Sequence, residues 1–153
     1  DEDQEDRAGQ VIDWKVVGAR DSQRLARTRA VLAADSLRSA QDLFNAALIL
    51  QHGERPEDYL LAHDLCVAGL ARVGGRQELI PSLAWLAAAS EDRWLWSIGR
   101  KQRFGTQMRP KTPIVVDGEV TDALRLMYNC PTLDAARKRA AEFEAAEKKA
   151  EKR

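Results

Sequence analysis

The chain has 153 residues, enough for one domain, and its 24 basic and 24 acidic side chains give a formal net charge of zero. Both signs are spread along the chain, which excludes a broad basic face for nucleic acid or for a membrane surface. No apolar run approaches the roughly 20 residues of a membrane span, so we expect a soluble, cytoplasmic protein whose Cys66 and Cys130 are free thiols. The chain begins at Asp1 rather than Met, which leaves a removed leader open.

The composition favours helix almost everywhere, because alanine is abundant and β-branched residues are scarce. The sequence therefore predicts an all-α single domain of five or six helices in antiparallel pairs, with one long ordered loop. Within it we expect an N-terminal arm over 1–20 that packs on the body, a helical core over 21–136, and a charged C-terminal helix or tail over 137–153.

Apolar residues at helical spacing predict four helices in the first hundred residues. They cover 21–34, 40–51, 56–72, and a stretch that begins near 77 or 81 and ends at 98. Ser39 is expected to cap the second helix, Pro56 to open the third and Gly99 to end the fourth. The fourth is the most apolar of the helices, so we expect it to be central.

The stretch from 100 to 118 has closely spaced glycines and prolines and no helical period, and it predicts the long loop. Long loops in small domains are frequently functional. A short helix from Thr121 to Tyr128 and a last helix from Thr132 to Ala150 are expected to follow. The rhythm of the helices looks similar to Sel1-like and tetratricopeptide arrays, although two pairs are fewer than the three repeats of such arrays.

Polar groups break the apolar pattern in three places, where burial without a partner would cost several kcal/mol. Asp92 falls on the apolar face of the fourth helix and is followed by Arg93. His63 lies on the packing face of the third helix, and Gln51 with His52 ends the second. Structural explanations also stay open for these residues. His63 would be bonded to a carbonyl, His52 would interact with the C-terminus of its helix, and Asp92 with Arg93 would belong to a buried ion pair.

Five short sequence blocks occur in order along most of the chain. They are Asp3-Gln4-x-Asp6-Arg7, Gln51-His52-Gly53, Ala62-His63, Asp92-Arg93 and Gly105-Thr106-Gln107. As a set they resemble an uncharacterised bacterial family, a domain of unknown function with D-Q-x-D-R, Q-H-G, A-H, D-R and G-T-Q signatures. The resemblance implies a shared helical fold and a shared polar site onto which the N-terminal arm folds; it implies no particular reaction.

These side chains together predict a polar pocket suited to metal-free general acid/base chemistry, such as hydrolysis, elimination or cyclisation. His52 is the expected acid or base, Asp92 its orienting partner or a ligand for Arg7, and His63 a further catalytic candidate. The substrate is expected to be a small molecule or peptide that carries an anionic or amide group. The residues expected to bind it are Arg93, Gln107, Gln51, Gln4, Arg7 and Thr106.

Two other functions stay open from the sequence. The paired helices would suit a protein- or peptide-interaction module in which Arg93 reads a carboxylate of the partner. His52, His63, Asp92 and an N-terminal aspartate would suit zinc, iron or manganese, although the histidines are eleven residues apart rather than at helical spacing. No cofactor is expected, because the glycines form no phosphate-binding loop motif.

Overall fold

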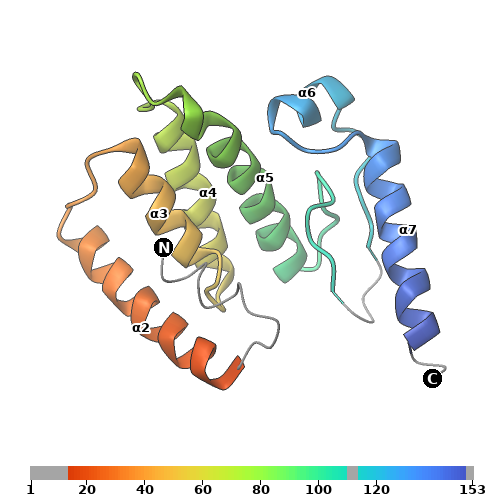
Figure 1. The fold of residues 1–153 in the computed structure, drawn as a ribbon, viewed down its shortest axis with the longest axis horizontal. Coiled ribbons are helices and arrows are strands. Elements are labelled where there is room, and N and C mark those ends of the chain that lie inside the picture. Colours follow the sequence, from red (N-terminus) through yellow and green to blue (C-terminus); the bar gives the residue numbers. More distant parts are fainter. Residues whose placement is uncertain (1–13, 110–113, 151–153) are drawn as a thin grey trace.

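The computed structural model describes residues 14–109 and 114–150, and over these ranges the chain folds into α-helices, one 3-10 turn and connecting loops (Figure 1). The elements are α2 (Trp14–Ala33), α3 (Ala40–Leu50), α4 (Pro56–Leu70), η1 (Gln77–Leu79), α5 (Ile80–Ser97), α6 (Asp122–Met127) and α7 (Leu133–Ala150). The fold is all-α, as the sequence predicts. Within the described ranges the one β-type contact is a single parallel bridge between Gln102 and Val116.

Two of the helices begin at the capping residues that the sequence indicates. The Ser39 hydroxyl accepts a hydrogen bond from the Asp42 amide at 3.1 Å, and the Asp42 carboxylate accepts one from the Ser39 amide at 2.9 Å. This reciprocal pair satisfies two amides that the first turn of α3 would otherwise leave without partners. At α6 the Thr121 hydroxyl accepts a hydrogen bond from the Leu124 amide at 3.3 Å.

The first described helix is longer than predicted. We expected a helix from 21 and an arm before it, whereas α2 already begins at Trp14. The valines and Gly18 lower the helix propensity of this stretch, but Val17 is only 4% exposed and its burial favours an ordered helix. Residues 14–20 of the expected arm are therefore helical, and residues 1–13 lie outside the described part of the chain.

The main core lies where α4 packs against α3 on one side and against α5 on the other. Its fully buried side chains include Ala47, Leu50, Ala62, Leu86 and Ala87. Small alanine side chains let neighbouring helices approach closely, so the abundance of alanine serves the packing as well as the helix propensity. The fourth predicted helix, which corresponds to α5, was expected to be central; the observed centre of this core is α4, with α5 beside it.

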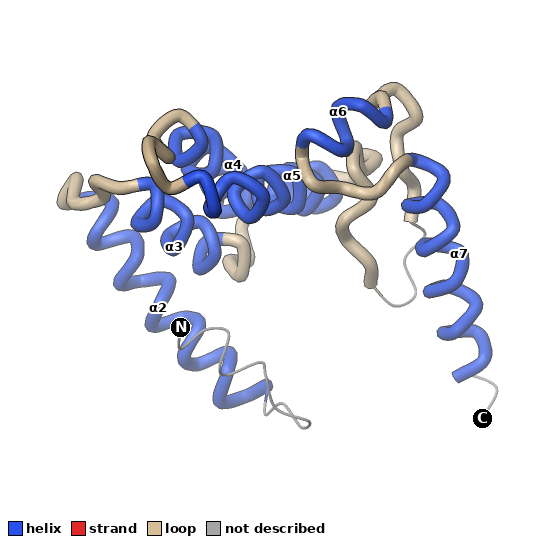
Figure 2. Tube along the Cα trace, turned by 45° about the horizontal axis from the view of Figure 1, so that its top comes forward, coloured by secondary structure: helices blue, strands red, loops and turns tan. Residues whose placement is uncertain are grey.

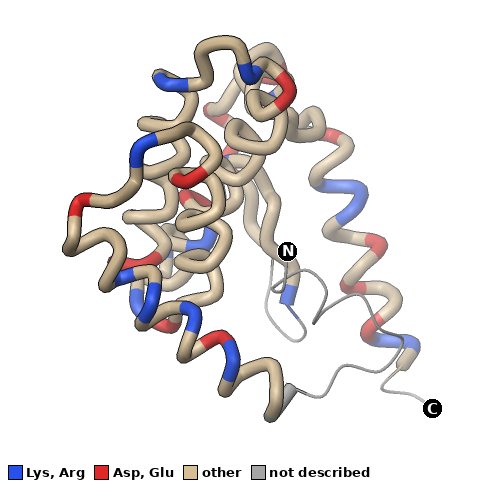
Figure 3. The backbone as a smooth tube through the Cα atoms, turned by 60° about the vertical axis from the view of Figure 1, so that its left-hand side comes forward, with Lys and Arg blue, Asp and Glu red and all other residues tan. Residues whose placement is uncertain are grey.

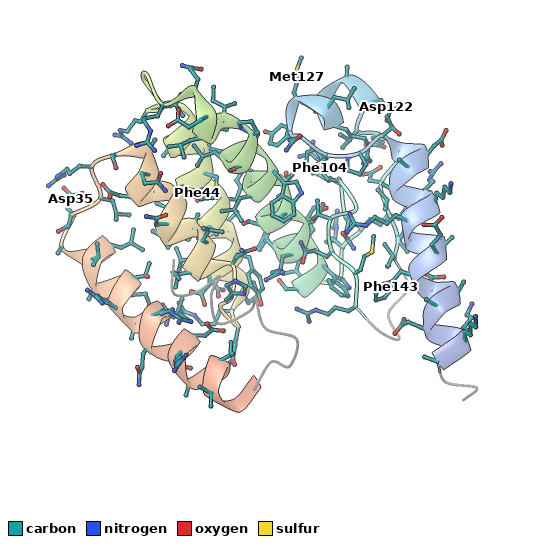
Figure 4. The ribbon with its side chains drawn as sticks, in the orientation of Figure 1. Asp35, Phe44, Phe104, Asp122, Met127 and Phe143 are labelled. Carbon is teal, nitrogen blue, oxygen red and sulfur yellow. The ribbon has the colours of Figure 1, made fainter. Side chains whose placement is uncertain are left out.

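A second, smaller core lies between α5, the long loop and α6. It contains Ala88, Phe104, Val120 and Cys130, and the rings of Phe104 and Tyr128 are 5.0 Å apart between centroids. Figure 4 shows Phe104 in the space between α5 and α6. This packing fixes the loop against the main helices.

The helices at the two ends of the chain stand at opposite ends of the molecule. In Figure 2, α2 and α7 both extend below the layer formed by α3, α4 and α5, α2 beside α3 and α7 beyond the loops that adjoin α6. Both outer helices carry charged residues along their length, mostly basic ones on α2 and both signs on α7 (Figure 3). α7 continues without a break through residue 137, the position at which we expected a boundary. None of the described helices is both long and apolar enough to span a membrane.

Gly105 is expected to be essential for the path of the loop. Its φ is +71°, and a Cβ atom there would lie 2.9 Å from Val116 Cγ2 and 3.3 Å from Ala136 Cβ. Gly105→Ala should therefore lower the free energy of unfolding by about 2–3 kcal/mol, from backbone strain plus overpacking.

Gly99 provides a matched control for this substitution. Its φ is +75°, but a Cβ there would meet no atom within 4 Å. Gly99→Ala should lower the free energy of unfolding by only about 1 kcal/mol in a urea titration. Equal losses at the two positions would show that the loop does not pack tightly at Gly105.

Candidate functional site

The long loop returns to α5 because Asp92 holds its backbone. Asp92 is completely buried, and its Oδ1 accepts hydrogen bonds from the amides of Arg103 at 2.6 Å and Phe104 at 3.0 Å. Its Oδ2 accepts the amide of Thr106 at 2.9 Å and the Thr106 hydroxyl at 2.8 Å. Each carboxylate oxygen therefore has two donors, all of them from the loop.

This arrangement gives Asp92 a role that the sequence did not predict. We expected the carboxylate to orient His52 or to pair with Arg7; among the described residues its hydrogen bonds go to the loop and not to His52, and Arg7 lies outside the described part of the chain. Burial raises the pKa of the Asp92 carboxyl, and the hydrogen bonds from Phe104 and Thr106 oppose that rise. A sequence pattern can show that a carboxylate is buried, but it does not show that backbone amides distant along the chain will satisfy it.

A buried arginine holds the same stretch of loop from its other side. Arg125 of α6 is completely buried, and its Nη1 donates a hydrogen bond to the Phe104 carbonyl at 3.1 Å. Its Nη2 donates to the carbonyls of Arg103 at 2.6 Å and Asp117 at 3.0 Å, and its Nε donates to the Val120 carbonyl at 3.1 Å. Backbone carbonyls thus accept all of these hydrogen bonds.

Asp92 and Arg125 therefore act on one piece of backbone with opposite polarity. Asp92 accepts from the amides of Arg103 and Phe104, while Arg125 donates to the carbonyls of these two residues. The peptide dipoles lie between the two buried charges and stabilise both of them. Arg125 could not be identified from the sequence, because an arginine in a short helix is normally exposed.

The glutamines complete the loop and connect it to Arg93. The Gln102 side chain donates to the Gln107 carbonyl at 2.9 Å and accepts the Gln107 amide at 2.8 Å. The Gln107 side chain donates to the Ala89 carbonyl at 3.1 Å and accepts from Arg93 Nε at 3.0 Å. We expected the Gln107 side chain to bind a substrate; in the structure its amide group links the loop to α5.

Arg93 joins three parts of the site. Besides Gln107 in the loop, its guanidinium donates to the backbone carbonyl of Gln51, and it lies 5.8 Å from the centre of the Tyr59 ring. Burial lowers the pKa of Arg93, while the Tyr59 side chain opposes that change. The structure thus brings together four of the predicted residues, Arg93, Gln107, Thr106 and the backbone of Gln51.

His63 has the structural role that the sequence left open. Its Nδ1 lies 3.0 Å from the Ala87 carbonyl oxygen, a hydrogen bond that ties α4 to α5. The carbonyl is a hydrogen-bond acceptor, so it fixes the proton of the ring on Nδ1. This contact favours a structural role over the catalytic one that we expected for His63.

His52 lies in a different place, at the turn between α3 and α4, where it lines a cavity of about 430 Å³. α2 closes the other side. The full lining is Gly18, Asp21, Ser22, Leu25, Arg29, His52, Glu54, Arg55 and Asp58. The cavity therefore gathers a histidine, two arginines and three carboxylates from segments that are distant in the sequence.

Asp58 is the buried centre of this cavity, with 2% of its surface exposed. Arg29 Nη2 donates to both carboxylate oxygens at 2.7 and 2.8 Å, and Arg55 donates from Nη2 at 2.8 Å and from Nε at 3.3 Å. A Cβ atom on Gly53 would lie 2.6 Å from Asp58 Oδ2, so only glycine fits in this position of the turn. Two guanidinium groups thus share one carboxylate beside His52.

The pKa of Asp58 predicts how this cavity responds to acid. Burial raises it, but the hydrogen bonds and charges of Arg55 and Arg29 together outweigh burial and hold the pKa below the ordinary 3.8. A carboxyl whose pKa is lower in the folded state stabilises the fold at pH values above 3.8, and this stabilisation is lost as pH falls through the lowered value. Asp58→Asn should therefore make stability, measured by urea unfolding, less sensitive to pH below about 4. An unchanged acid slope would contradict the ion pairs.

Sequence reasoning missed Arg29, Arg55 and Asp58. The first-turn position of Asp58 in its helix suggested an exposed acidic residue, and Arg29 lies 29 residues away from it. The spacing of Arg55 and Asp58, three residues apart, was a local signal for the ion pair.

Other expectations concern residues or ligands that the structure does not bring to the site. Gln4 and Arg7 lie outside the described residues. Among the described residues, no three His, Cys, Asp or Glu side chains are grouped to hold a metal ion. Cys66 and Cys130 are buried free thiols, as predicted, and burial raises their pKa values to about 12 and about 11. Neither is suited to act as a nucleophile near neutral pH.

Comparison of the chain with protein-family models, with curated proteins and with solved structures finds no match.

Proposed function

We propose that the protein is a small enzyme that performs metal-free acid/base chemistry on an anionic substrate, with His52 as the group that transfers the proton. The observation that carries the proposal is the shared cavity. His52, Arg29 and Arg55 line the same space of about 430 Å³, a volume suited to a small molecule. Histidine is the side chain whose ordinary pKa is closest to neutral pH, which suits it to general acid/base catalysis.

The charges around Asp58 support an anionic substrate. Arg29 and Arg55 bring two positive charges to a single carboxylate, and the Asp21 carboxylate has a partner in Arg24 at 3.1 Å. Glu54 adds a further carboxylate to the lining, so the support rests on the arginines themselves: the side chains of Arg29 and Arg55 are 41% and 60% exposed and share one buried carboxylate. A carboxylate or phosphate group of a substrate would accept hydrogen bonds from them, because guanidinium groups bind such anions through paired hydrogen bonds.

In this proposal Arg93 positions the catalytic turn instead of binding the substrate. It does not line the cavity, but its bond to the Gln51 carbonyl holds the peptide that leads directly into His52. Through Gln107 and Thr106, this contact continues to Asp92. The loop thus supports, through Arg93, the turn that carries His52.

The proposal is tested with a panel of small anionic esters, amides and hydroxy acids. His52→Gln retains a polar side chain of similar reach but removes the titratable group. We expect any activity of the full chain to fall by at least about 10²-fold in this variant, the typical contribution of one acid/base residue. His63→Gln is the matched control, and it should retain activity because His63 bonds to a backbone carbonyl.

Equal losses in both histidine variants, or activity unchanged in His52→Gln, would overturn the proposal. The alternative of a protein- or peptide-interaction module predicts a different result. In that case the wild-type chain would turn over none of the compounds, and His52→Gln would change only the affinity for a partner. Circular dichroism and urea unfolding of each variant separate a loss of chemistry from a loss of fold.

A further inference from the structure

The end of α5 and the chain that follows it carry a group of basic side chains outside the cavity of His52. The group consists of Arg93, Arg100, Lys101 and Arg109. Within the described residues none of the four forms an ion pair, whereas the neighbouring Arg103 pairs with Glu91 at 2.6 Å. A helix C-terminus carries about half a negative charge, which offsets only a small part of four positive ones.

Trp96 lies at the centre of this group. The guanidinium carbon of Arg109 lies 4.8 Å from the centre of the Trp96 ring. The same tryptophan lines a cavity of about 280 Å³ together with Arg100 and Lys101. The remaining lining residues are Gly99, Gln102 and Val115. One aromatic ring therefore joins a stacked arginine to a cavity that has two further cations in its wall.

Arg93 adds a partly buried positive charge to the group. The acceptors of its hydrogen bonds, the Gln107 side chain and the Gln51 carbonyl, are both neutral, so they leave its charge uncompensated. Burial lowers the pKa of Arg93, and the positive charge of nearby Arg109 lowers it further. Like charges that are held together in this way favour binding of an anion.

We infer that the cavity at the end of α5 binds a small organic phosphate. Arg100 and Lys101 would contact the phosphate oxygens, Arg109 would add to the positive potential, and the Trp96 ring would pack against the organic group. Several cations in one place favour a doubly charged phosphate over a single carboxylate. The aromatic ring favours a ligand with an apolar or planar part. This site is separate from the proposed catalytic cavity, whose lining contains none of these residues.

Isothermal titration of the full chain with phenyl phosphate tests the inference, with inorganic phosphate as the parallel probe. We expect a saturable site for phenyl phosphate that is retained in Arg55→Gln, and at least about threefold weaker binding of inorganic phosphate at that site. Lys101→Ala and Arg109→Ala should each weaken phenyl phosphate binding about tenfold, the typical effect of losing one charged contact. Trp96→Leu should remove the difference between the two probes.

Two further variants serve as controls. Arg72→Ala removes one exposed positive charge that follows the end of α4, and it should leave the affinity unchanged. Arg55→Gln alters the catalytic cavity and should leave the affinity of the Trp96 site unchanged while phosphate binding beside His52 is lost, which separates this site from the proposed function. Four results would overturn the inference: no binding to the wild-type chain, equal affinity for both probes, an equal loss in Arg72→Ala, or loss in Arg55→Gln with binding retained in Lys101→Ala.

Discussion

Asp92→Ala is expected to lower the free energy of unfolding by about 3–5 kcal/mol, a large part of the stability of a domain of this size. The substitution removes the acceptor of four hydrogen bonds and leaves the amides of Arg103, Phe104 and Thr106 without their partner in a buried site. Asp92→Asn keeps one acceptor oxygen, but its NH₂ group faces hydrogen-bond donors of the loop. Its free energy of unfolding should lie between those of the wild type and the alanine variant.

Urea unfolding measures these differences, and limited trypsin digestion shows where they arise. Cleavage after Arg103 should become faster in Asp92→Ala, because the loop would lose its anchor. The control is Asp64→Ala on α4, an exposed carboxylate whose removal should change the free energy of unfolding by less than about 0.5 kcal/mol. An Asp92→Ala protein as stable and as resistant to trypsin as this control would contradict the role of Asp92.

Arg125→Met is the second substitution with a large expected effect, a loss of about 3 kcal/mol or more in the free energy of unfolding. Methionine fills a similar volume but leaves four backbone carbonyls without their donor. Some buried ion pairs tolerate hydrophobic substitution because both partners are replaced together. Here the partners of the arginine are backbone carbonyls, which no substitution removes, so that tolerance is not expected. Arg125→Lys, with fewer donors, should recover part of the loss.

Arg139→Met, on the exposed side of α7, is the control for the change from arginine to methionine. It should change the free energy of unfolding by less than about 0.5 kcal/mol. Because Asp92 and Arg125 hold the same two residues of the loop, the double variant should lose less stability than the sum of the single losses, by about 1 kcal/mol or more. Additive losses would show that the two buried charges act independently.

The elements could be predicted from sequence because their signals are local. The caps Ser39 and Thr121 and the apolar spacing indicated α3 to α7 to within a few residues of their observed bounds. The start of α2 was wrong, since only tertiary packing of Val17 shows that residues 14–20 belong to the helix.

The site could be predicted only in part. Asp92 was correctly expected to be buried, but the described donors that satisfy it come from a loop more than ten residues later and not from His52. Arg93 and Gln107 are neighbours as expected. Arg29 and Arg125 escaped prediction, because an isolated arginine gives no sequence signal that distinguishes a buried side chain from an exposed one.

The claim that His52 shares an anion-binding cavity with Arg29 and Arg55 is tested most directly by NMR of the histidine rings during a phosphate titration. The chain has only two histidines, so His63 is an internal reference. We predict that the His52 ring signals shift saturably, that those of His63 stay fixed, and that Arg55→Gln removes the shift. Unmoved His52 signals, or an equal shift in Arg55→Gln, would contradict the claim.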